Sequence, residues 1–490
     1  MKKNKLLPIL CFGILASTNG LAQNNDPRKA YDDFKKQAQQ KYNDFRTQAN
    51  EQYAAFLKRA WEQYNALPAI PKPKDETVPP VTIPEDDKNK PIESNPIPIK
   101  DVVAPPTPNP QPTPIAPIKE NSQLQERTVD FTYCGTKCQI RINKNLNLSL
   151  QDCNNEQLSN VWTQLSAEGV LNNTIRDCLA IRVGRNLCDW AYLNLLSSFS
   201  KAMYGNSNEA TMLTSYIYAQ SGYKMRLGRN EQHIYLLYAS EHGIYDILYF
   251  DIDGLKFYPF ECDKDKLEIC DASFPKEKPL SLYIPQNQKF EYNASDIRTL
   301  TSRRYPDVQV QVQVNKNLIE FYNTYPSSEV NANFMTRWAM YANTPLDAKV
   351  KEKLYPALKE KINGLNQLEA ANKLLNWVQT AFVYEYDDKV WGHDRAFFAE
   401  ETLYYPYCDC EDRSILFSRL IRDLLGLKTI LVFYPGHLAS AVCFTDKVAG
   451  DYIMLDDKRF IITDPTYIGA PVGNTMPDMD NTQASVILLE

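Results

Sequence analysis

Hydrophobic positions near the N-terminus recur every 11 residues. The recurring positions are Tyr31, Tyr42, Tyr53 and Tyr64 in one row, Phe34, Phe45, Phe56 and Leu67 in a second, and Ala38, Ala49 and Ala60 in a third. Such a period corresponds to about 3.67 residues per turn, so the rows stay on one face of a helix. The pattern predicts an amphipathic helix of coiled-coil type over residues 30–67. Its apolar face needs a partner, which is a second copy of the chain, another protein or the chain's own globular part.

A proline-rich stretch follows this helix. Between Pro68 and Pro117 lie 16 of the chain's 31 prolines, with few bulky apolar residues among them. Proline fixes φ and removes an amide donor, so residues 68–125 are predicted to be an extended, semi-rigid linker without a core. Such a linker would keep the helix and the globular part separable in space.

Alternation of apolar and polar residues returns after Glu126, and the returning pattern is repeated. A strand-like stretch ending in the sequence INKNL at residues 142–146 recurs as VNKNL at residues 314–318. The second instance follows valines at 308, 310 and 312 that alternate with glutamines, which is typical of a half-buried strand.

A helix-like segment at residues 208–221 aligns with residues 412–425, and without a gap His233 then falls on His437. We therefore predict two tandem copies of one α+β fold, over residues 126–305 and 306–490. The first copy has Asn206 where the second has Cys410, so it is predicted to be degenerate and His233 to be a structural relic. The second copy is longer just before Cys410, and long loops beside a site often form lids or substrate walls.

The net charge and the N-terminal sequence indicate which partners and which location to expect. The formal net charge of -6 with mixed signs argues against a nucleic-acid partner. Lysines at 2, 3 and 5, an apolar run over 6–16 and the sequence Leu21-Ala22-Gln23 predict a signal peptide over residues 1–22. An uncleaved anchor is the alternative, but the run is shorter than the roughly 20 residues of a membrane span. We expect export to the periplasm, the medium or the cell surface, with no membrane span after cleavage.

Export would permit disulfides among the remaining ten cysteines, seven of which lie in the middle of the chain. The spacing does not fix their pairing. Metal binding is the competing use of these residues. It is disfavoured because the chain has no Cys-x-x-Cys pair and only four histidines, so we expect no metal and no cofactor.

Candidate chemistry centres on Cys410. Apolar residues at helical spacing follow it, Asp409 and Asp412 fit the N-cap and N3 positions, and Gly426 fits the C-terminal stop. A thiol in the first turn feels the positive end of the helix dipole, worth about 0.3–1 kcal/mol, which favours the thiolate. Glu411 and Asp412 oppose this effect, so a cationic neighbour is required.

Two other residues can complete a catalytic set. His437 begins an apolar strand rich in small residues, from which an imidazole can take the thiol proton and return it to a leaving amine. Asp464 follows another strand and can accept from the second ring nitrogen. The alternatives are a structural thiol, a satisfied strand histidine and an ordinary turn aspartate.

The run Cys410-Glu411-Asp412-Arg413-Ser414 before an apolar helix, then Gly436-His437 on a strand and Asp464-Pro465-Thr466, resembles the core motifs of the transglutaminase-like, or papain-like, cysteine peptidase superfamily. The resemblance implies a Cys-His-Asp triad and acyl transfer through a thioester to water or to an amine. It does not choose between the two acceptors. A second cysteine, Cys408, departs from the pattern.

Secondary site residues are less sharply indicated. The backbone amide of Cys410 is one expected oxyanion donor, and Gln379 or Tyr405 is the candidate for the other. Trp391 and His393 in the longer loop are candidates for lining the substrate channel, with an ordinary surface loop as the alternative for His393.

The sequence thus predicts an exported cysteine acyl-transfer enzyme acting on a protein or peptide amide. Processing of cell-wall peptides shares this chemistry and differs only in substrate. The alternative is a non-catalytic envelope scaffold that uses the same fold for interactions, with residues 30–67 mediating self-association or binding a partner protein.

Overall fold

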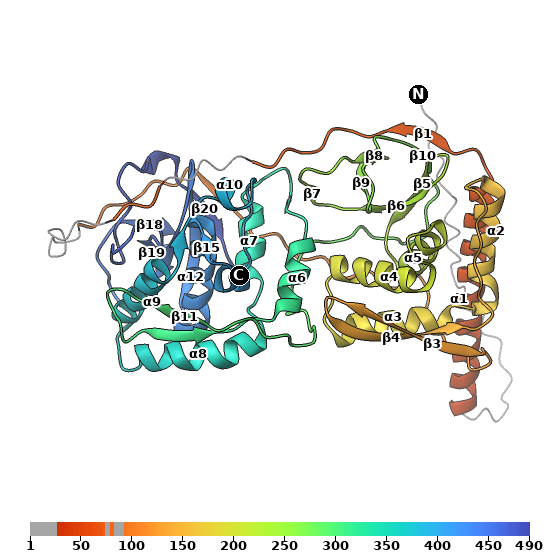
Figure 1. Cartoon of the computed structure of the whole chain (residues 1–490), viewed down its shortest axis with the longest axis horizontal. Coiled ribbons are helices and arrows are strands. Elements are labelled where there is room, and N and C mark those ends of the chain that lie inside the picture. Colours follow the sequence, from red (N-terminus) through yellow and green to blue (C-terminus); the bar gives the residue numbers. More distant parts are fainter. Residues whose placement is uncertain (1–26, 74–78, 83–92) are drawn as a thin grey trace.

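The computed structural model describes residues 27–73, 79–82 and 93–490, so the expected signal peptide lies outside the described residues. Two units lie side by side, each with its own six-stranded sheet and covering helices (Figure 1). A long helix, α1 (Pro27–Leu57), stands at the outer end of the first unit. This mixture of helices and mainly antiparallel sheets confirms the α+β class.

The first unit is built on a six-stranded sheet. In spatial order its strands are β1 (Glu62–Asn65), β10 (Lys266–Cys270), β5 (Met225–Arg229), β6 (Ile234–Ala239), β9 (Leu255–Pro259) and β8 (Phe250–Ile252). A hairpin of β3 (Glu126–Tyr133) and β4 (Thr136–Asn143) accompanies α2 (Asn155–Ser166), α3 (Asn172–Gly184), α4 (Asp189–Tyr204) and α5 (Asn208–Gln220).

The second unit repeats this plan. In the corresponding order its sheet contains β2 (Asp101–Val103), β20 (Ser485–Leu488), β16 (Lys428–Tyr434), β17 (His437–Cys443), β19 (Lys458–Thr463) and β18 (Tyr452–Leu455). Its hairpin is β11 (Arg298–Thr301) with β12 (Gln309–Val312), and its helices are α6 (Lys316–Thr324), α7 (Thr336–Asn343), α8 (Ala348–Ile362), α9 (Gln367–Ala381), α10 (Asp387–Val390), α11 (Ala399–Tyr404) and α12 (Cys410–Leu425). All neighbouring strands are antiparallel in both sheets, except that β2 runs parallel to β20.

Helix α12 lies against β17 because both elements bury apolar faces. Leu416 and Leu420 on the helix lie in one buried cluster with Leu438 and Val442 on the strand. The Ser414 hydroxyl adds a 2.8 Å hydrogen bond to the Leu438 carbonyl. The helix ends at Gly426 in the left-handed conformation (φ 67°), as predicted.

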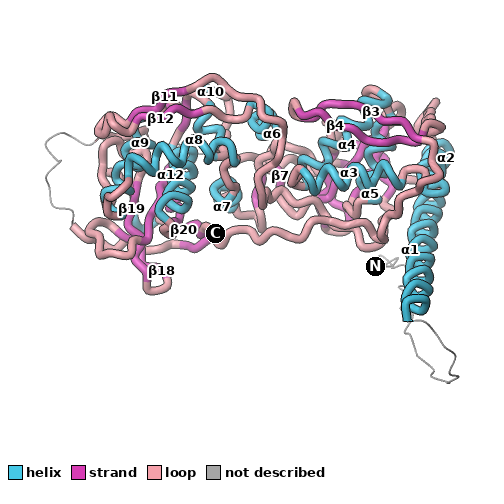
Figure 2. Tube along the Cα trace, turned by 90° about the horizontal axis from the view of Figure 1, so that it is seen from below, coloured by secondary structure: helices cyan, strands magenta, loops and turns pink. Residues whose placement is uncertain are grey.

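The predicted helix over 30–67 is too long by about one 11-residue repeat. Helix α1 ends at Leu57, and Tyr64 lies instead in β1, opposite Leu267 of β10. Pairing with a sheet edge therefore overrides the helical pattern in the fourth repeat. The C-terminal half of α1 packs on α2 and buries Tyr53, so the chain's own globular part is the partner there. The N-terminal half extends beyond α2 (Figure 2).

The proline-rich segment is extended but is not a free linker, which corrects the prediction for residues 68–125. It supplies β2 to the second sheet, and Ile97 and Val103 are buried there. Prolines lack the amide donor, but the residues between them make sheet bonds, such as the 2.8 Å bond from the Ile97 amide to the Tyr452 carbonyl. The segment therefore contacts both units along its length, and it does not act as a free linker between α1 and the rest of the chain.

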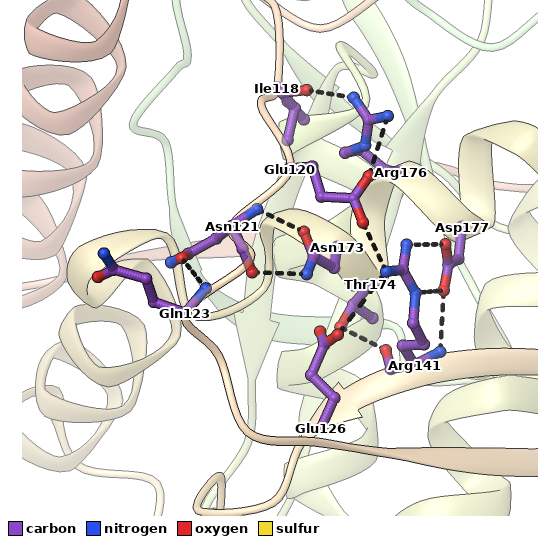
Figure 3. Close-up of polar contacts among 10 residues, drawn as sticks. All are labelled: Ile118, Glu120, Asn121, Gln123, Glu126, Arg141, Asn173, Thr174, Arg176 and Asp177. Carbon is purple, nitrogen blue, oxygen red and sulfur yellow. Dashed lines mark hydrogen bonds and ion pairs between the residues drawn. The ribbon is translucent and has the colours of Figure 1, made fainter.

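The end of this segment is fixed to the first unit by paired polar groups (Figure 3). The Asn121 amide donates to Asn173 Oδ1 at 2.8 Å, and Asn173 Nδ2 donates back to the Asn121 carbonyl at 2.9 Å. Nearby, Arg141 on β4 makes a two-pronged contact with Asp177 on α3, at 2.9 and 2.7 Å, and also binds Glu120 at 2.8 Å. This network joins the segment, the hairpin and α3.

The boundary predicted at 305/306 is wrong, because it falls inside the β11–β12 hairpin. That hairpin begins at Arg298 and corresponds to β3–β4 in the first unit, so the second unit starts earlier. The predicted extra length does lie before Cys410. Only three residues separate α4 from α5, whereas β14 (Val383–Tyr384), α10, α11 and β15 (Tyr407–Cys408) lie between α9 and α12. A short ladder of β7 (Gly243–Ile244) with β13 (Ser328–Glu329) links the units.

All ten cysteines in the described part of the chain are free thiols, so the expected disulfides are not formed. Eight of them are buried, where cysteine packs as a small hydrophobic residue. Burial raises the pKa of the Cys188 thiol to about 12. Among the described helices none has the length and apolarity needed to cross a membrane.

Candidate active site

The three predicted catalytic residues come from neighbouring elements of the second unit. Cys410 is the first residue of α12, His437 is the first residue of β17, and Asp464 directly follows β19. Strands β17 and β19 are paired, and α12 packs on β17. Each of the three residues is only 2% exposed, so they share one buried region at the same end of these elements.

His437 and Asp464 are in direct contact, as predicted. His437 Nε2 donates to Asp464 Oδ2 at 2.9 Å. The other carboxylate oxygen accepts from the backbone amides of Thr466 at 2.8 Å and Tyr467 at 3.2 Å, which fixes the direction of the carboxylate. The second ring nitrogen, His437 Nδ1, is buried and has no hydrogen-bond partner among the described residues. It is therefore left as a base with a free lone pair.

The Cys410 sulfur contacts the backbone next to this histidine, and it is held as a thiol without a hydrogen bond to the His437 ring among the described residues. A hydrogen bond from the Leu438 amide, next to His437, lowers the pKa of the sulfur. Burial raises that pKa much more, and so do the charges of Glu411 and Asp409, so the net pKa lies well above the ordinary value. Cys410 Sγ donates to Glu411 Oε2 at 3.1 Å. The expected stabilisation of the thiolate by the helix dipole is thus outweighed by desolvation and by adjacent carboxylates.

Several carboxyl groups surround the thiol. Burial and the Glu411 charge raise the pKa of Asp387 to about 8, and burial also raises the pKa values of Asp409 and Asp412. Asp412 caps the helix start as predicted, because it accepts from the Asp409 amide at 3.3 Å. Ligand atoms of Asp409, Cys410 and Glu411 lie within 4.8 Å of one another, as do those of Asp387, Asp409 and Asp412. These groups have the spacing to hold a cation, although the sequence predicted no metal.

Arg413 is a structural residue that the sequence analysis did not single out. Its guanidinium is buried and donates to the carbonyls of Gln379 at 3.2 Å, Phe382 at 3.0 Å and Pro465 at 3.4 Å. It therefore ties the end of α9 to the loop that carries Asp464. Its place within the motif at 410–414 was the available signal.

Gln379 is buried, but its side chain is not free to bind an oxyanion. Nε2 donates to the carbonyls of Asp464 at 3.0 Å, Tyr467 at 2.8 Å and Ala470 at 3.0 Å, while Oε1 accepts from the Gly469 amide at 3.1 Å. With its donors used in this way, Gln379 shapes the Asp464 loop. The prediction of an oxyanion donor at this position is corrected accordingly.

Tyr405 is also held elsewhere, which corrects the second oxyanion candidate. Its hydroxyl donates to Asn323 at 2.8 Å, and its ring makes an edge-to-face contact with Trp391, with centroids 4.8 Å apart. Trp391 is thus an anchor of the inserted loop, with Arg395 lying 4.4 Å over its ring. His393 is exposed on that loop. None of these three candidates contacts Cys410 through a hydrogen bond.

Tyr384 is a further neighbour of the thiol that the sequence analysis missed. It lies in β14, whose parallel pairing sets it opposite Cys408 of β15. Burial raises the pKa of its phenol, and the charges of Cys410 and Asp409 raise it further, so the ring stands close to the nucleophile. The inserted segment thereby forms one wall around Cys410.

Comparison with known proteins gives no independent assignment. No protein-family model, curated protein or solved structure matches the chain.

Proposed function

We propose that the second unit catalyses acyl transfer with Cys410 as nucleophile, His437 as base and Asp464 as the residue that orients the base. The reaction would attack an amide of a protein or peptide and pass the acyl group, through a thioester, to water or an amine. The observation that carries the proposal is the 2.9 Å contact between His437 and Asp464, in which Nδ1 of His437 has no partner among the described residues. The next residue, Leu438, binds the Cys410 sulfur through its backbone amide.

The proposed steps use only these groups. Cys410 gives its proton to His437 Nδ1 while sulfur attacks the carbonyl carbon, and the imidazolium is stabilised by Asp464. Collapse breaks the carbon–nitrogen bond as His437 returns the proton to the leaving amine. Water or a primary amine then attacks the thioester with the same base, which restores the thiol.

Glu411 adds a condition to this route. In the resting arrangement the thiol donates to Glu411, so it must turn from Oε2 of that residue to Nδ1 of His437 before attack. Binding of an amide beside α12 would displace the carboxylate from the thiol. The resting thiol would thereby be protected from alkylation and oxidation, which require the thiolate.

The resemblance to the transglutaminase-like superfamily supports the proposal through the same residues. The matching sheet orders of the two units support a duplicated fold of that kind, with the first copy lacking the nucleophile. We further propose that the chain acts outside the cytoplasm, on the basis of the signal-like sequence at residues 1–22.

The test is turnover by the purified chain with labelled casein as acyl donor. Hydrolysis is followed as release of ammonia or peptides, and transfer as incorporation of a fluorescent primary amine. Replacing Cys410→Ala is expected to lower either rate at least about 1000-fold, as loss of a nucleophile does. Cys443→Ala, at the other end of β17, is the matched control. Equal loss in both variants, or none in Cys410→Ala, would end the catalytic proposal.

The alternative proposal is an interaction protein without turnover. Two observations favour it: the raised pKa of Cys410, and the exposed row of Tyr31, Phe34 and Tyr42 on the part of α1 beyond α2. This row would mediate self-association or bind another protein. A chain inactive on all amide probes whose association is lost on replacing the three residues by serine would support this alternative.

A further inference from the structure

The first unit contains a pocket of about 350 Å³ beside the start of α5. Its walls come from α4, the short turn between α4 and α5, β6 and the turn after β9. Three of its lining residues are Asn206, His233 and Phe260. None of them belongs to the catalytic set proposed for the second unit.

The position of the pocket follows from the repeated fold. The two units align at a constant offset of 204 residues. With this offset, α5, β5, β6 and β9 correspond in turn to α12, β16, β17 and β19, and the first and last residues of each pair of elements agree within two residues. Asn206 then corresponds to Cys410, His233 to His437 and Phe260 to Asp464. The pocket therefore occupies the place where the second unit would carry out its chemistry.

The first unit lacks the nucleophile and the carboxylate at these positions, but its pocket leaves room for a ligand. Asn206 offers no nucleophile and Phe260 cannot orient an imidazole. The floor is nevertheless polar: Ser197 and Thr214 are 6% and 4% exposed, and neither hydroxyl has a hydrogen-bond partner among the described residues. Both residues line the pocket, and their hydroxyls are not among the fully buried side-chain atoms of the described residues that lack a partner. They are therefore free to donate to or accept from a polar occupant.

The rim adds charge of both signs. Lys201 on α4 pairs with Glu261 at 2.5 Å, and both side chains are partly exposed at the pocket edge. Hydroxyl and amide groups in the pocket match the N–H and C=O groups of an extended peptide, while the ring of Phe260 offers an apolar contact. A strongly charged ligand of one sign would oppose one member of the rim pair.

We propose that this pocket binds an extended, polar peptide segment of the polypeptide on which the second unit acts, without cleaving it. The identity of the peptide as substrate rests on the proposed function, whereas binding itself does not. The first unit would thus raise the local concentration of substrate for the catalytic unit.

Binding is measured by fluorescence anisotropy with fluorescein-labelled casein, an unfolded polypeptide, on the full chain carrying Cys410→Ala. Two changes probe the pocket. His233→Trp fills its exposed mouth and is expected to weaken Kd at least fivefold. Thr214→Val removes an unpartnered hydroxyl without changing shape and is expected to weaken Kd roughly two- to tenfold, the range for one hydrogen bond. Asn145→Trp, on the exposed turn after β4, is the control and should leave Kd unchanged.

The outcomes separate this proposal from the catalytic one. Loss of binding in both pocket variants, with no turnover by the unmodified chain, would keep the pocket and reject catalysis. Unchanged casein binding in both pocket variants would overturn the pocket proposal even if the unmodified chain is active. Binding of chitotriose that His233→Trp abolishes, with casein binding unaffected, would overturn the assignment to a peptide.

Discussion

Replacing Glu411 by Gln tests why the Cys410 thiol is held protonated. The Glu411 carboxylate accepts from Cys410 Sγ at 3.1 Å and is almost fully buried. Two negative charges at this distance repel by about 5 kcal/mol at an effective dielectric constant near 20. That energy corresponds to roughly four pKa units. Because Asp409 remains nearby and the site can relax, we expect the pKa of Cys410 to fall by about one to four units.

The assay is the pH dependence of alkylation at Cys410 by iodoacetamide, followed by peptide mass spectrometry on the folded chain. Only the thiolate reacts, so the pH of half-maximal rate reports the pKa of the Cys410 thiol. The glutamine keeps the shape of the side chain. Glu400→Gln, which neutralises another buried carboxyl, is the matched control and should leave the Cys410 profile in place. A profile unmoved, or moved to higher pH, in Glu411→Gln would refute the electrostatic argument.

Two further predictions concern stability. Burial raises the pKa of Glu400 to about 8, so the folded state holds this proton more tightly than the unfolded state does and loses stability as pH rises from about 4.5 to about 8. Glu400→Gln should therefore raise the free energy of unfolding at pH 9 by up to about 5 kcal/mol, seen as a higher melting temperature, and should not raise it at pH 4. An equal effect at both pH values would contradict this reasoning. Tyr53 stacks on Phe274 at 4.5 Å and is 1% exposed, so Tyr53→Ala should cost about 3–5 kcal/mol in denaturant titrations and expose α1 to protease, whereas Tyr42→Ala in the same row, 47% exposed, should change neither.

Much of the second unit was predictable because local pattern and final environment agree there. The apolar spacing after Cys410 gives the buried face of α12, and Asp412 and Gly426 mark its ends as expected. The strands that carry His437 and precede Asp464 are short apolar runs that become neighbours in one sheet. Each of these signals lies within a few residues of the element it specifies.

The edge strands could not be predicted because their signal lies in their partners. The sequence Glu62–Asn65 continues a helical repeat, and Asp101–Val103 lies among prolines, yet both pair with strands far along the chain. Likewise the hydrogen bonds of Gln379 go to a loop about 90 residues away, which no local pattern reveals. The sequence analysis also identified Glu411 as a charge that opposes the Cys410 thiolate. That this effect outweighs the helix dipole depends on burial of the site, which only the folded structure determines.

One segment that supplies an outer strand to both sheets limits how the molecule can be shortened. A fragment starting at residue 126, where composition alone would place the first globular residue, lacks β1 and β2. Strands β10 and β20 would then present bare backbone amides and carbonyls to solvent, and exposed edges of this kind recruit other chains and aggregate. Recombinant fragments that keep α1, β1 and β2 should remain monodisperse where those that begin at residue 126 precipitate, even though the stretch between α1 and residue 126 contains few of the bulky side chains on which solubility is usually judged.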